Sequence, residues 1–120
     1  MSAKDPGSTL MTKNPRVGSG NFLADQGYQD PEEARIKFLI ANEIALAIED
    51  LRLTQVAAAE KTGLRQPDIS RIVNGNVADY SVWRLIKVLS SLGKDISIEI
   101  RSSVKARGDI FAVSFDQAGG

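Results

Sequence analysis

Apolar residues recur at helical spacing over one long stretch of the chain, which begins after Asp30 and runs to about Leu51. Asp30 can cap a helix, Pro31 suits a first turn, and Glu33 completes a capping box. The sequence therefore predicts a helix from Pro31 to about Leu51. The apolar positions cover more than one narrow stripe, which favours a central helix buried on several sides. The alternative is that a second apolar face meets another protein. The positions are Ile36, Phe38, Leu39, Ile40, Ala41, Ile44, Ala45, Leu46, Ala47, Ile48 and Leu51.

Two shorter helices are predicted next, within residues 54–75. Thr54 is suited to cap a helix over 55–62, and Gly63 can end it in a left-handed turn. A second helix begins near Gln66-Pro67 and ends at Asn74-Gly75. The alanines at 57–59 are small enough for the two backbones to approach closely. This pair is typical of a DNA-binding helix-turn-helix, although an α-hairpin in any small helical domain would show the same features.

The inner and outer faces of the second short helix differ in chemistry. Ile69 and Ile72 lie three residues apart, so they share a face and are predicted to anchor the helix to the core, together with Leu64. The opposite face carries side chains that can bond to base edges and phosphates. They are Gln66, Ser70, Arg71 and Asn74.

A last helix and one or two strands are predicted in the C-terminal part. Ser81 caps a helix from 82 to 92, which Gly93 ends. Residues 95–101 (DISIEIR) alternate between apolar and polar, which indicates a strand, and residues 109–115 are a second candidate. Tyr80 and Trp83 are interpreted as packing residues rather than base-stacking aromatics.

The isoleucines of the first predicted strand have two possible locations. Ile96, Ile98 and Ile100 could belong to the core of their own chain. A lone strand, however, leaves backbone groups unpaired. Pairing with the same strand of a second copy would satisfy these groups and create a two-fold homodimer. We therefore predict these three residues as a dimer contact.

Composition bounds the chemistry that the chain can perform. The 120 residues have room for one small domain, and 42% hydrophobic with 25% charged residues is ordinary for a soluble protein. The chain has no cysteine and no histidine, which removes disulfides, thiolate zinc sites and the usual general base. We therefore expect no enzyme activity, metal or cofactor. The N-terminus lacks a secretory signal and no apolar run is long enough for a membrane span, so the expected location is cytoplasmic.

Charge is unevenly distributed although the chain is neutral overall. Residues 52–107 carry ten Lys and Arg against five Asp and Glu, a net charge of +5, and the rest of the chain is acidic. A basic segment beside an acidic one suits a DNA-facing surface. Solvated charges scattered by chance would give a similar bias. We divide the chain into a disordered arm (1–20), a DNA-binding domain (21–94), and C-terminal strands with a tail (95–120).

Residues 54–75 resemble the helix-turn-helix of the phage-repressor and Cro-like proteins, known as the XRE family. The matching positions are Thr54-Gln55, Ala59, Gly63, Gln66, Ile69, Ile72 and Asn74-Gly75. The resemblance implies a mainly α fold, a lambda-repressor-like helical bundle, to which the predicted strands would be added. Two further segments resemble the HigA-like antitoxins of this family. They are Ser19–Gly27 (SGNFLADQG) and Leu92–Ile96 (LGKDI).

The resemblance implies roles for single residues. Gln55, at the start of the first short helix, would contact a phosphate, and Gln66 would read a base edge, its amide pairing with adenine N6 and N7. Arg71 would reach a guanine or a phosphate. The remaining predicted DNA contacts are Thr54, Arg65, Ser70, Asn74 and Asn76.

Three residues depart from the family pattern or complicate it. Thr62 stands where an apolar residue is more usual, and Pro67 cannot bond to a base. Asp68 would repel phosphate, but it could serve the helix dipole or accept from cytosine N4.

The sequence thus favours a dimeric, sequence-specific repressor that binds a palindromic operator. The antitoxin resemblance implies autoregulation of an operon and a small toxin as a second partner, for which residues 21–28 and the wide face of 36–51 are the candidate contacts. The alternative is a helical adaptor that binds proteins only.

Overall fold

The structure is a computed structural model that describes residues 30–115. Within these residues it contains four helices: α2 (Pro31–Asp50), α3 (Gln55–Thr62), α4 (Gln66–Val73) and α5 (Val82–Ser91). All four were predicted, with boundaries that agree within one or two residues. The predicted arm (1–20) and the predicted helical turn at 21–28 lie outside the described residues.

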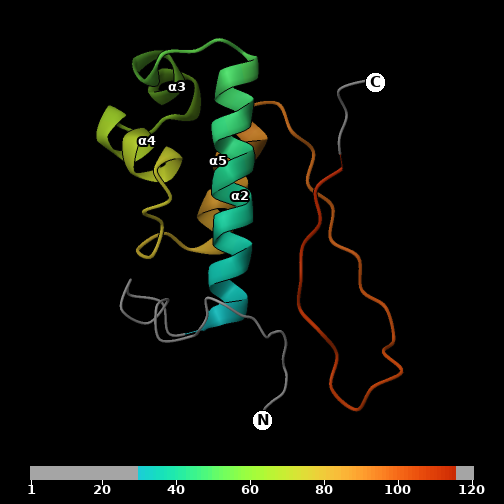
Figure 1. The fold of residues 1–120 in the computed structure, drawn as a ribbon. Helices are drawn as coiled ribbons and strands as arrows, with labels where there is room; N and C mark the ends of the chain where they lie inside the picture. The colour runs from blue at the N-terminus through green and yellow to red at the C-terminus, as the bar shows by residue number, and fades with distance from the viewer. Residues whose placement is uncertain (1–29, 116–120) are drawn as a thin grey trace.

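Helix α2 is the longest of the described helices, and the other three helices lie beside it (Figure 1). The Asp30 carboxylate accepts from the backbone N–H groups of Glu32 and Glu33, at 3.0 and 3.4 Å, so the predicted cap is present. Helix α5 packs along α2, and α3 and α4 form a pair that contacts both. The chain leaves α2 through Arg52, a non-glycine residue with a φ of 56°.

The core lies where α2, α4 and α5 meet. Its fully buried large side chains come from these helices and from the loop after α4; they are Ile44, Ile69, Ile72, Val77 and Leu85. Of the apolar residues of α2, Ile40, Ile44 and Ile48 are buried, while Leu46 is exposed. The interpretation of α2 as a central, well-buried helix is therefore confirmed for most of its apolar surface.

The prediction of C-terminal strands is wrong for the single chain. Residues 95–101 and 109–115 are both described, and neither forms a strand. The alternation requires an extended backbone, but a strand also needs a hydrogen-bonded neighbour, and these arms make no ladder with each other or with the bundle in the described chain. Ile98 and Ile100 are 74% and 90% exposed, so they do not belong to the core of their own chain.

Candidate nucleic-acid interface

The turn between α3 and α4 sets the angle at which α4 is presented. Thr54 caps α3 by accepting from the Ala57 N–H at 3.0 Å, and Gly63 ends it at a φ of 78°. Ala58 and Ala59 are buried, so α3 approaches the bundle closely. Ile69 and Ile72, both fully buried, fix the inner face of α4. The outer face of α4 is therefore held rigidly toward solvent.

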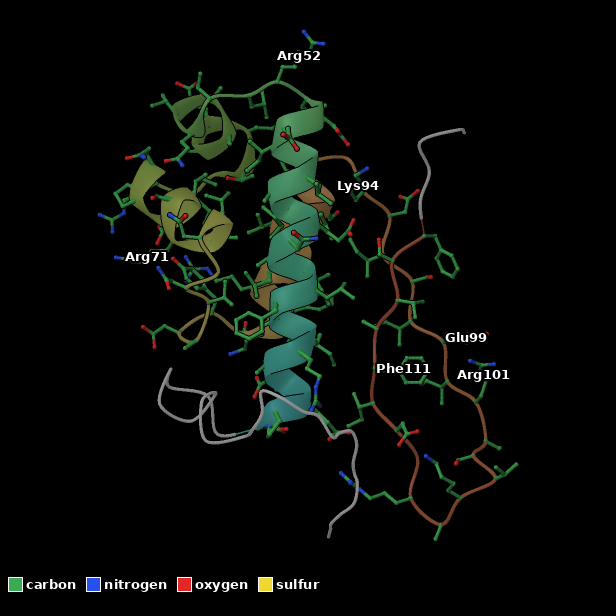
Figure 2. The ribbon with its side chains drawn as sticks, viewed as in Figure 1. Arg52, Arg71, Lys94, Glu99, Arg101 and Phe111 are labelled. Carbon is green, nitrogen blue, oxygen red and sulfur yellow. The ribbon has the colours of Figure 1, made fainter. Side chains whose placement is uncertain are left out.

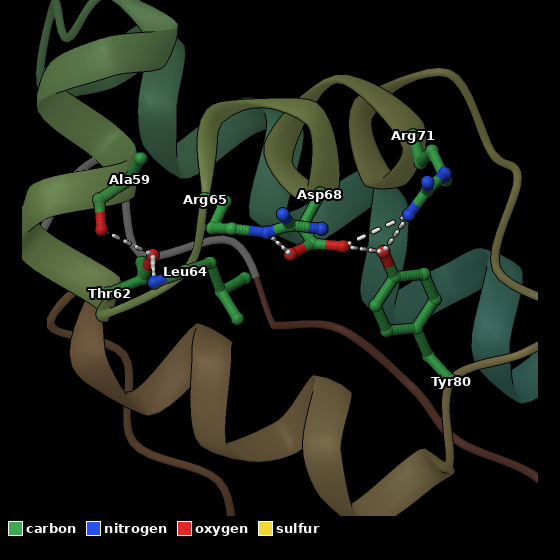
Figure 3. A network of polar contacts seen from close by, with 7 residues as sticks. All are labelled: Ala59, Thr62, Leu64, Arg65, Asp68, Arg71 and Tyr80. Carbon is green, nitrogen blue, oxygen red and sulfur yellow. Dashed lines mark hydrogen bonds and ion pairs between the residues drawn. The ribbon is translucent and has the colours of Figure 1, made fainter.

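Thr62, which departs from the family pattern, has a structural role in this turn (Figure 3). Its hydroxyl donates to the carbonyl of Ala58 at 2.8 Å and approaches that of Ala59 at 3.4 Å. The same oxygen lies 3.4 Å from the N–H of Leu64, beyond the glycine. The polar side chain thus bonds to backbone groups on both sides of the turn, a function that an apolar residue could not perform.

Gln55 and Gln66 are brought together although they lie on different helices. The side-chain amide of Gln66 donates to the side-chain carbonyl of Gln55 at 2.5 Å. Gln66 is exposed at the start of α4, and Gln55 is half-buried at the start of α3. The two glutamines therefore form one polar unit at the surface, which leaves the carbonyl and one N–H of the Gln66 amide free of this bond.

The other predicted contacts surround this pair. Five of them are exposed and Ser70 is half-buried; the exposed ones are Thr54, Arg65, Arg71, Asn74 and Asn76. Two of them also bond to the backbone: Thr54 caps α3, and the side-chain amide of Asn74 donates to the carbonyl of Ser70 at 2.9 Å. Together these residues follow the start of α3, the outer face of α4 and the loop after it.

Asp68, whose charge could repel a phosphate, is turned away from the outer face of α4. Its carboxylate accepts from the Tyr80 hydroxyl at 2.6 Å and from Arg71 Nη1 at 3.0 Å, and Arg65 Nε lies 3.9 Å away on the other side (Figure 3). The residue is only 9% exposed. Accepting from cytosine N4 is therefore excluded in this arrangement, and the two arginines offset the charge that would repel phosphate.

The pKa values of this network move in the directions that its geometry predicts. The Tyr80 hydroxyl bond lowers the pKa of Asp68 most, and burial opposes that effect. Burial, followed by the bond to Asp68, raises the pKa of Tyr80. The pKa of Arg71 is raised, chiefly by its 3.3 Å contact with the Tyr80 oxygen. At neutral pH the network is therefore an anion held between a neutral phenol and two cations.

The polar contacts of two residues in this region were not predicted from the sequence. Tyr80 is buried, as predicted for a packing residue, but its hydroxyl also orients Asp68 and Arg71. The same prediction is wrong for Trp83, whose side chain is 63% exposed at the start of α5. Lys37 of α2 is buried, and its Nζ donates to the carbonyl of Ala78 at 3.1 Å, which ties α2 to the loop after α4. No local spacing could reveal either contact, because the partners lie 12 and 41 residues apart.

A hollow of about 340 Å³ lies beside the network, between the end of α4 and the start of α5. Arg71, Asn76 and Arg84 line it, and the Arg84 guanidinium lies 4.9 Å from the centre of the Tyr80 ring. Asp68 and Asp79 also border it, so its charges are mixed. Among residues 30–115 no group of acidic side chains has the arrangement of a metal site, and no helix is long and apolar enough to cross a membrane.

Comparisons with known proteins agree with this geometry. A family model described as a helix-turn-helix domain matches residues 22–101, well over half of the chain. One solved structure, described as an XRE family transcriptional regulator, is similar with 32% sequence identity and a TM-score of 0.63, covering 71% of this chain and 96% of that one. The comparison with curated proteins gave no match. From the fold, the helix-turn-helix geometry and these two similarities, the chain belongs to the XRE-like helix-turn-helix family.

Proposed function

We propose that the protein is a sequence-specific, DNA-binding transcriptional repressor. The observation that carries the proposal is the outward presentation of the Gln55–Gln66 pair above a rigidly packed α4. Membership of the helix-turn-helix family and the likeness to an XRE family transcriptional regulator support it. In this proposal α4 enters the major groove and the start of α3 lies on the DNA backbone.

The hydrogen bond between the glutamines suggests how a base would be read. Recognition of adenine by glutamine needs one amide N–H for N7 and the amide oxygen for the N6 amino group. Gln55 uses only one of the two N–H groups of Gln66. The bond would therefore orient the Gln66 amide while leaving the adenine-reading pair of atoms available. Arg65, Asn74 and Asn76 would contact phosphates, and Arg71 a guanine or a phosphate.

The repressor would act as a homodimer on a palindromic operator and block transcription by occupying it. Two copies related by a two-fold axis would present two α4 helices about one DNA turn apart. Selection of bound DNA from a random pool, followed by mass measurement of the complex, tests this. We expect two inverted half-sites and two protein chains for each operator. A selected pool without any common sequence would contradict the proposal.

A second proposed role is that of an antitoxin that regulates its own operon. Leu46 of α2 and Leu51, which follows the helix, remain exposed, which leaves an apolar area for a protein partner beside the buried part of α2. The resemblance of residues 19–27 to HigA-like antitoxins points to a small toxin as that partner. Co-expression with the product of a neighbouring gene should relieve its toxicity and yield a complex that purifies intact. The absence of both effects would exclude this role while leaving DNA binding untouched.

A further inference from the structure

The two C-terminal arms lie close to each other beside the turn that joins them. A Cβ placed on Gly108 would lie 3.7 Å from the Cβ of Ser103, so these two residues stand opposite each other. The residues between them form the turn, and Lys105 Nζ of the turn lies 2.6 Å from the carboxylate of Asp109 just beyond it. In an antiparallel hairpin one such pair fixes all the others. Counting away from the turn, the opposed pairs are 100 with 111, 98 with 113, and 96 with 115.

This register sorts the side chains of the arms into two unlike faces. All six residues of the pairs just named are large and apolar; they are Ile96, Ile98, Ile100, Phe111, Val113 and Phe115. We call this set the apolar face. The alternate residues form the other face, where small or polar side chains predominate; they are Ser97, Glu99, Arg101, Ile110, Ala112 and Ser114. In Figure 2, Phe111 of the returning arm is drawn at the level of Glu99 and Arg101 of the outgoing arm, as this register requires.

The contacts that tie the arms to their own bundle do not use the apolar face. The Ser114 hydroxyl, on the other face, lies 2.8 Å from the Glu43 carboxylate of α2, and Arg107 of the turn lies 3.5 Å from that of Glu32. Val113 and Phe115 stay 61% and 75% exposed, like Ile98 and Ile100. Ile96 is 37% exposed and the other five residues of the apolar face are all more than 60% exposed, so its own chain covers only the start of this face.

We propose that residues 95–115 close into a two-stranded hairpin whose apolar face docks on the same face of a second copy of this chain. The proposal rests on the proposed function, which needs two copies on a symmetric operator, and it specifies the surface that joins them. It replaces pairing through residues 95–101 alone, because that arrangement would leave Phe111, Val113 and Phe115 in solvent.

Three observations favour a second copy as the partner. A two-stranded hairpin is marginal alone, and packing against a second sheet supplies the cover that it lacks. The hairpin carries three acidic and three basic residues, so two copies meet without net repulsion. Two phenylalanines and four aliphatic side chains offer an area comparable to the about 800 Å² that each partner buries in a stable interface.

The first experiment measures the mass of the full chain by light scattering over a range of concentrations, for three proteins. We expect wild type at twice the 13.0 kDa chain mass, Ile98→Lys weakened at least tenfold in dimerisation, and Val104→Lys unchanged. Val104 is the matched control because it is fully exposed and apolar but lies in the turn. An unfolding curve for each protein identifies a variant that has lost its fold. A monomeric wild type, or a folded Ile98→Lys that dimerises normally, would overturn the proposal.

A second experiment tests the register independently of dimerisation. The chain has no cysteine, so Ile98→Cys with Val113→Cys introduces a single pair, and residues directly opposite each other across a hairpin can be bridged. We expect fast oxidation to an intrachain disulfide, and slow oxidation for Ile98→Cys with Ala112→Cys, whose side chains lie on opposite faces. Equal rates would refute the register.

The two proposals fail in different ways. If wild type binds a selected operator but Ile98→Lys leaves its mass unchanged, the interface is wrong and the repressor stands. If Ile98→Lys separates the copies but wild type binds no DNA, the interface stands and the repressor is wrong.

Discussion

The side-chain amide of Gln66 is the group whose removal should change sequence preference most. Gln66→Ala would lose both hydrogen bonds to the proposed adenine, and we expect specific affinity to fall by roughly 1–3 kcal/mol with relaxed preference at one base pair. Gln55→Ala should weaken binding to all sequences, because its proposed contact is a phosphate. It also removes the bond that would orient the Gln66 amide, so we expect a smaller loss of preference at the same base pair than Gln66→Ala causes. Fluorescence anisotropy against operators changed at single positions separates the two effects. A Gln66→Ala protein with the wild-type preference would remove Gln66 from base reading.

The hydroxyl of Tyr80 should control the titration of Asp68. Because the bond from Tyr80 lowers the pKa of this carboxyl, the bond stabilises the fold above the roughly 3.9 of an unfolded aspartate, and that stabilisation is lost as the pH falls through the lowered folded pKa. Tyr80→Phe keeps the ring, so its packing beside the core is preserved. We expect the pKa of Asp68, followed by NMR, to rise in the variant. We also expect the two proteins to differ less in stability at acid pH than at neutral pH. A pKa that stays unchanged would show that the arginines, rather than the phenol, hold the carboxylate.

At the scale of elements, the glycine between α3 and α4 is required by backbone conformation rather than by space. Gly63 has a φ of 78°, and a Cβ added there would meet no atom within 4 Å. Gly63→Ala should therefore destabilise the fold by about 1–2 kcal/mol through strain alone. Gly108→Ala is a suitable control, because the added Cβ would make an ordinary 3.7 Å contact and the residue has no positive φ. Thermal unfolding measures the stability of both variants. Similar melting temperatures for the two would show that the positive φ of Gly63 is not the reason for the glycine.

Helix caps and turn glycines were predictable because their signals are local. Thr54 and its N–H partner lie three residues apart, and Gly63 follows directly on the helix that it ends. The roles of Lys37 and of the Tyr80 hydroxyl depend on contacts across the bundle, which no spacing within one element contains. The strands were overpredicted for a related reason. Alternation of Ile96, Ile98 and Ile100 identifies an extended, one-sided backbone, but it does not supply the neighbour to which that backbone must bond.

The same distinction applies to the candidate interface. A sequence pattern could nominate Gln66, Arg71 and their neighbours because helical spacing places them opposite Ile69 and Ile72. It left the direction of Asp68 open, since the carboxylate lies near the boundary between the two faces. Only the fold shows that Tyr80 draws this carboxylate away from the outer face, which makes α4 more suitable for an anionic partner than its residue list suggests.

For the whole molecule, the dependence of DNA binding on salt decides between a repressor and an adaptor that binds proteins only. The neutral net charge of the chain gives no long-range attraction to DNA, so affinity must come from local cations such as Arg65, whose side chain is 80% exposed. We expect log affinity to fall linearly with log salt concentration, with a slope of several units, on the order of one for each phosphate contact.

Arg65→Gln should lower that slope by about 1 and weaken operator and unrelated DNA equally, because its proposed contact is a phosphate. Gln66→Ala is the matched control on the neighbouring residue, and it should keep the wild-type slope while losing discrimination between sequences. The ion pair of Arg65 with Asp68 is long, at 3.9 Å, so its loss should have little effect on folding. An Arg65→Gln protein with an unchanged slope would place Arg65 away from the DNA backbone. Wild-type binding that is absent at every salt concentration would instead favour the adaptor.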